Sequence, residues 1–140
     1  MATLRRRRGG DERGAAAVEF ALVSVVFFTL VFGIIQFGLW FWSWQAAGHA
    51  AREAARVAAV SPCQDAAITD AATNGLQAVP SVATPVVTFV RTSPVAVGDE
   101  ITVTVAFETF DIGFLPLGPF TVNKSATSRV ENVPGGMAGC

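Results

Sequence analysis

One acidic side chain stands at the edge of a long uncharged segment. Glu19 follows the stretch "GAAAV", and no Asp, Glu, Lys or Arg occurs from Phe20 to Gly48. A carboxylate just inside a bilayer is costly unless it is paired or reaches the interface, and such groups are usually functional. The chemistry available to Glu19 is therefore ion pairing. The alternative is a glutamate in the first helical turn, where it stabilises the positive end of the helix dipole.

The other polar residues do not suggest an enzyme. The chain has one histidine, His49, and no tyrosine, and its acidic residues after position 60 are scattered. No nucleophile, base and orienting group can be assembled from them, so we predict a protein that is not an enzyme and has no cofactor. A structural zinc site normally needs four Cys or His ligands, and this chain has three such residues in all. We therefore predict no metal.

The two cysteines, Cys63 and Cys140, both follow the apolar segment. A disulfide between them would close a long loop and stabilise a small domain by roughly 4 kcal/mol in the chain-entropy model. We expect this intramolecular bridge. Two free thiols, or a bridge to another subunit, remain the alternatives.

The apolar segment predicts a single membrane span. Of the 140 residues only 15% are charged, against roughly 25% in soluble domains. A helix of about twenty apolar residues crosses a hydrocarbon core of roughly 30 Å, and this segment is longer. Trp40, Trp42 and Trp44 cluster at its far end, where indole rings favour the membrane–water interface. Gln36 lies within the segment and would need a partner or a water.

The basic residues predict the orientation. Five of the ten lie within the first 13 positions, which places the amino terminus in the cytoplasm and the residues after about 50 outside. The close apolar segment argues against a nucleic-acid-binding tail. It is also too long for a conventional cleaved signal peptide.

The patterns beyond the segment predict an α+β fold. The alanine-rich stretch up to Val60 continues the helix over about 15–60, and Ser61-Pro62 should end it. Its small side chains would let another helix approach closely. A second helix should follow Pro62 and end at Asn74-Gly75 or Pro80. From there the apolar period is two, with Ile101, Val103, Val105 and Phe107 on one face. We expect this helix to pack on a small antiparallel sheet of three or four strands.

Residues 13–60 resemble the TadE-like family of minor pseudopilins. The matching marks are Arg13-Gly14, "AAAVEFAL", "FGIIQFG" and "AAREAAR". The resemblance implies a processing site formed by Gly14, Ala15, Glu19 and Phe20, at which a prepilin peptidase cuts between Gly14 and Ala15. It also implies that Glu19 pairs with the new amino terminus of Ala15 on a neighbouring subunit. Gln36 is a departure, because family members commonly have glutamate there.

Together these observations predict three parts: a basic cytoplasmic leader over 1–14, a transmembrane and extended helix over 15–60, and an extracytoplasmic domain over 61–140. The resemblance implies a single-pass protein of the bacterial cytoplasmic membrane that acts structurally in Tad/Flp pilus assembly and adhesion. Its partners would be the membrane, the prepilin peptidase, other pilin-like subunits and the assembly platform, and not nucleic acid. The alternative is an uncleaved membrane protein whose outer domain binds an envelope partner or surface ligand.

Overall fold

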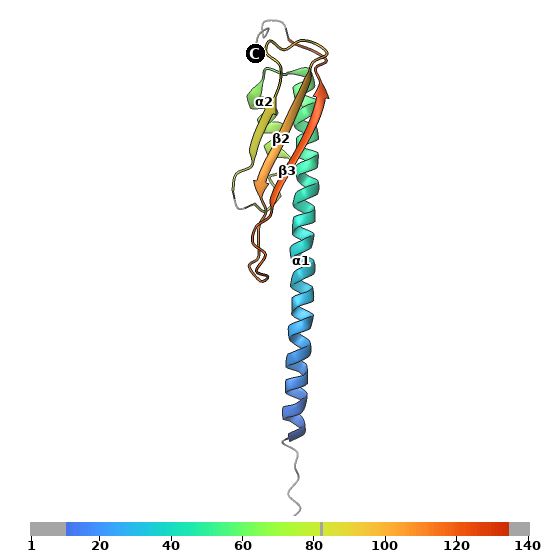
Figure 1. The fold of residues 1–140 in the computed structure, drawn as a ribbon, viewed down its shortest axis with the longest axis vertical. Helices are drawn as coiled ribbons and strands as arrows, with labels where there is room; N and C mark the ends of the chain where they lie inside the picture. Colours follow the sequence, from blue (N-terminus) through green and yellow to red (C-terminus); the bar gives the residue numbers. More distant parts are fainter. Residues whose placement is uncertain (1–10, 82, 135–140) are drawn as a thin grey trace, which may run out of the picture. The chain divides into compact units, whose positions relative to one another are not determined.

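The computed structural model describes residues 11–81 and 83–134, with side chains from residue 14. The elements follow the order α1 (Asp11–Val60), α2 (Asp65–Asn74), β1 (Val86–Val90), β2 (Glu100–Glu108) and β3 (Thr121–Arg129), and Figure 1 shows each of them. The α+β class is therefore confirmed. The chain divides into two units, residues 1–35 and 36–140.

The first unit holds the amino-terminal part of α1. No residue in the most apolar 18-residue stretch of this helix is buried inside the protein, and the helix is long and apolar enough to cross a membrane once. The hydroxyls of Ser24 and Thr29 each donate to the carbonyl four residues earlier, at 2.7 Å, so neither is left unpaired. The helix begins at Asp11, one turn before the start near residue 15 that we predicted. Gly14 lies inside it, because glycine lowers helix stability by only about 1 kcal/mol.

The second unit contains the antiparallel sheet, with strand order β1-β2-β3. In β2, Ile101, Val103 and Val105 are fully buried, as their alternation predicts, while Thr102 and Thr104 are half-buried. The segment "TVNKSATSR" forms one nine-residue strand, β3, that pairs along the whole of β2. Three strands therefore form, because no turn sequence interrupts β3.

The core of the second unit lies between the sheet and the alanine-rich end of α1. It combines the buried face of β2 with Ile68 and Ala72 of α2 and with a row of small residues on α1: Ala47, Ala50, Ala51, Ala54, Ala55 and Ala58. A Cβ placed on Gly75, just after α2, would lie 3.3 Å from Ala50. The small face of α1 is thus covered by elements of its own chain. Close approach of this kind requires small side chains on both sides.

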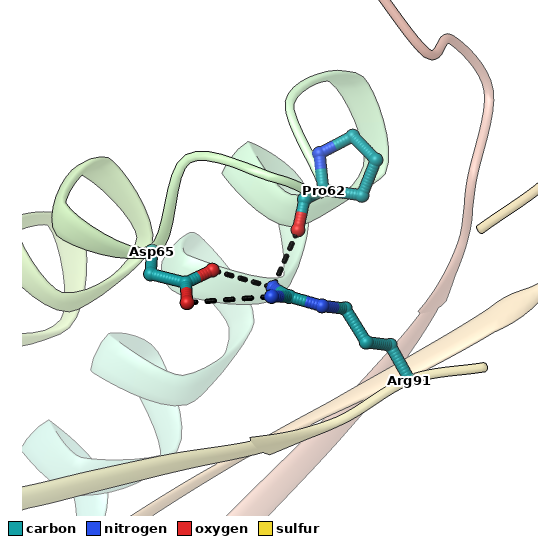
Figure 2. A network of polar contacts seen from close by, with 3 residues as sticks. All are labelled: Pro62, Asp65 and Arg91. Atoms are coloured by element: carbon teal, nitrogen blue, oxygen red, sulfur yellow. Dashed lines mark hydrogen bonds and ion pairs between the residues drawn. The ribbon is translucent and has the colours of Figure 1, made fainter. Parts of the chain in front are cut away.

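Hydrogen bonds join β3 to α1, and join the end of β1 to the start of α2. Ser128 on β3 donates its hydroxyl to the Ala55 carbonyl at 2.6 Å, and the Glu131 N–H donates to the Ala59 carbonyl at 2.8 Å. Arg91, just after β1, donates to the Pro62 carbonyl at 2.7 Å and to both carboxylate oxygens of Asp65, as Figure 2 shows. This guanidinium ties the start of α2 to β1, a bidentate geometry that arginine favours.

Candidate functional site

The residues of the predicted processing site all lie in α1, and all are exposed. Ala15 and Glu19 are four residues apart, which places them on the same face of the helix one turn apart. Among the residues whose side chains are described, none makes a hydrogen bond or ion pair with Glu19. Within that part of the chain its carboxylate is free to pair. Phe20 beside it is 74% exposed.

The predicted interface anchors lie just after the start of the second unit. Trp42 is 44% exposed, and its role as an anchor stays a prediction. Trp40 and Trp44 are also exposed in part, but each packs against Phe120, with ring centroids 6.1 and 6.5 Å apart. The ammonium of Lys124 lies 3.3 Å from the centroid of the Trp44 ring. The anchors therefore also hold the end of the loop between β2 and β3, a contact that the sequence did not indicate.

The partner of Gln36 is this same loop. The Gln36 side chain is fully buried. Its Nε2 donates to the Phe110 carbonyl at 3.2 Å, and its Oε1 accepts the Ile112 N–H at 3.0 Å. An amide carries both a donor and an acceptor, so one side chain satisfies two backbone groups. The sequence signals were a lone amide in an apolar run and a distant glycine- and proline-rich loop, but nothing linked them.

The predicted disulfide stays a prediction. Cys63 lies in the turn after α1 and is half-buried. Cys140 lies outside the described residues. Within 11–81 and 83–134 no group of His, Cys, Asp or Glu side chains is placed to hold a metal ion. His49 is exposed on α1.

These features define a class: a small α+β unit built around one half of a long helix, whose other half is apolar and carries the exposed carboxylate of Glu19 near its start. Residues 14–56 match the family model described as TadE-like protein. The match runs from Gly14 to Arg56 and so includes Glu19, Gln36 and "AAREAAR". It confirms the resemblance and relates the chain to the Tad pilus, whose TadE-like proteins are generally structural. No curated protein and no solved structure shows significant similarity to the chain.

Proposed function

We propose that this chain is a minor pseudopilin of a Tad-type pilus, processed by a prepilin peptidase between Gly14 and Ala15. The observation that carries the proposal is the exposed carboxylate of Glu19, which has no partner among the described side chains and lies one helical turn from Ala15, at the start of the TadE-like match. The arginine-rich leader favours an amino terminus in the cytoplasm, with the residues after about 50, and so the domain over 61–140, on the outer side.

Cleavage would create a cation one helical turn from Glu19. A new α-amino group on Ala15 is largely protonated at neutral pH, since its ordinary pKa is about 8. Each subunit then carries one cation and one anion at the same end of α1. When the amino group of one subunit pairs with Glu19 of a second, and the amino group of that second subunit with Glu19 of a third, the contact is heterologous and repeats along a filament, whereas a reciprocal exchange would close a dimer. At the edge of a bilayer such a pair is stronger than in water. The protein would thereby act structurally in pilus assembly and adhesion.

The cut is tested by intact mass measurement of the chain from cells with an active prepilin peptidase. We expect a mature amino terminus at Ala15, and we expect Gly14→Ala to abolish the cut. Gly33→Ala is the matched control, because at both glycines an added Cβ would meet nothing within 4 Å. Recovery of the uncleaved wild-type chain would refute processing and favour the uncleaved single-pass membrane protein.

The pairing role of Glu19 is tested separately with Glu19→Gln, which keeps the shape of the side chain and removes its charge. We expect this variant to lose most of its co-purification with other pilin-like subunits, while the folded outer unit is unchanged. Ser24→Ala is the control on the same helix, since the Ser24 hydroxyl bonds only to the Phe20 carbonyl in the described part of the chain. Normal assembly by Glu19→Gln would rule out the pairing role.

A further inference from the structure

The loop between β2 and β3, residues 110–120, exposes more apolar surface than a connection normally does. It reads "FDIGFLPLGPF", and Phe110, Phe114, Leu117 and Phe120 are between 44% and 54% exposed. Its one charged residue is Asp111, whose carboxylate accepts the Gly113 N–H at 3.0 Å. Loops between strands are usually polar, and a group of exposed large apolar side chains marks a contact surface.

Residues of the loop itself fix its conformation. Gly113 and Gly118 have φ values of +68° and +72°, a region that only glycine adopts readily. The Leu117 N–H donates to the Leu115 carbonyl at 2.8 Å, and the Thr109 hydroxyl accepts the Phe120 N–H at 3.0 Å. The apolar side chains are therefore displayed by a structured turn.

Both ends of the loop are fastened to one short stretch of α1. Gln36 binds the backbone of Phe110 and Ile112, and Phe120 packs on Trp40 and Trp44. Polar groups begin further along the strand that follows, with Lys124 over the Trp44 ring and Ser128 bonded to Ala55. The loop and β3 form one side of the second unit. This side is thus apolar beside Gln36 of α1 and polar beside Ala55.

We propose that the loop over 110–120 docks on the lipid bilayer, with Phe114 and Leu117 at the boundary of headgroups and acyl chains and Lys124 among the headgroups. The inference rests on the proposed membrane span of α1. A hydrocarbon core of roughly 30 Å takes about twenty residues of helix, so a span that begins between Gly14 and Phe20 ends between about residues 33 and 39. The bilayer surface then lies close to the stretch of α1 to which the loop is attached, from Gln36 to Trp44. The ammonium of Lys124 suits the anionic phosphates of that layer.

The experiment uses a photo-crosslinking residue, benzoylphenylalanine, in the full chain reconstituted into vesicles of phosphatidylethanolamine and phosphatidylglycerol. It is placed in turn at Phe114, at Val97 and at Phe27. Val97 is 65% exposed but precedes β2, so it lies at the opposite end of that strand from the loop. Phe27 is 58% exposed within the apolar part of α1 and reports the span itself. Adducts are identified by mass spectrometry.

We expect lipid adducts at positions 114 and 27 and none at 97. We also expect Leu117→Asp to abolish the adduct at 114 and leave that at 27, whereas Leu117→Met changes neither. No lipid adduct at 27 would remove the membrane span and with it the proposed function. An adduct at 27 without one at 114 would overturn loop docking alone. A crosslink from 114 to a second protein chain in place of lipid, or equal adducts at 97 and 114, would also overturn it.

Discussion

Gln36→Leu tests the contact that joins α1 to the loop between β2 and β3. Leucine has about the volume of glutamine, so the substitution removes the polar contacts without opening a cavity. It leaves two backbone groups without their partner, namely the Phe110 carbonyl and the Ile112 N–H. We expect the loop to detach locally while the sheet stays folded, because β2 and β3 pair along nine residues that do not include these groups.

The size of the effect follows from the number of hydrogen bonds lost. A backbone group buried without a partner costs about 1 to 3 kcal/mol. Because both hydrogen bonds are only partly buried and the loop can open to return one or both groups to water, we expect less than twice the full cost, a net loss of about 2 to 4 kcal/mol in the stability of the closed loop. At 1.4 kcal/mol per factor of ten, the open fraction rises roughly 30- to 700-fold.

Hydrogen exchange measures this opening directly. The Ile112 amide should lose protection by that factor in Gln36→Leu, while amides in the centre of β2, such as Val103, should keep theirs. Ser43→Ala is the matched control, since Ser43 is also buried on α1 but its hydroxyl donates only to the Leu39 carbonyl within the same helix. Unchanged protection of Ile112 in Gln36→Leu would refute the reasoning, and so would an equal loss in Ser43→Ala.

Three further predictions concern the second unit. Arg91→Ala should lower the free energy of unfolding by about 2 kcal/mol, because the guanidinium of Arg91 bonds to Pro62 and Asp65 with only 16% of its side chain exposed. Arg56→Ala is the control: it removes an ion pair that is exposed to solvent on α1, so thermal unfolding should be unchanged. Gly75→Ala should cost about 1 to 3 kcal/mol in chemical denaturation, since its Cβ would press on Ala50, whereas Gly48→Ala should stabilise α1 by up to about 1 kcal/mol. The hydrogen bond from the Thr92 hydroxyl, followed by that from the Ala96 N–H, holds the pKa of Asp99 below its ordinary value of 3.8. The turn before β2 should therefore keep its full stability above pH 3.8 and lose it as the pH falls through the lowered pKa of Asp99. An amide-exchange titration should show that this loss at acid pH disappears in Asp99→Asn.

Much of the fold could be predicted because it depends on local pattern. The helix ends at Val60 as Ser61-Pro62 requires, and α2 ends at Asn74, before Gly75. The alternation in β2 placed Ile101, Val103 and Val105 on the buried face. Whether the sheet has three or four strands could not be decided from the sequence, because strand pairing depends on the partner strand and not on local sequence.

The candidate site divides in the same way. The spacing of Gly14 and Glu19 is local, and together with "FGIIQFG" and "AAREAAR" it suggested the resemblance to the TadE-like family that the match over residues 14–56 confirms. The role of the arginine leader and the bridge from Cys63 to Cys140 stay predictions. The contact between Gln36 and the loop could not be foreseen, since its two sides lie 74 and 76 residues apart. Nothing in either segment alone specifies the other.

The sequence by itself determined that this protein has a long apolar helical segment preceded by the carboxylate of Glu19, because charge and hydropathy act residue by residue along a single helix. Only the tertiary structure decided what covers the other half of that helix. The alanine face packs inside its own chain, and Gln36, which the sequence left without a partner, holds an apolar loop beside the tryptophans. The physical reason is that burial and hydrogen bonding between distant segments depend on their positions in space, which no local pattern encodes.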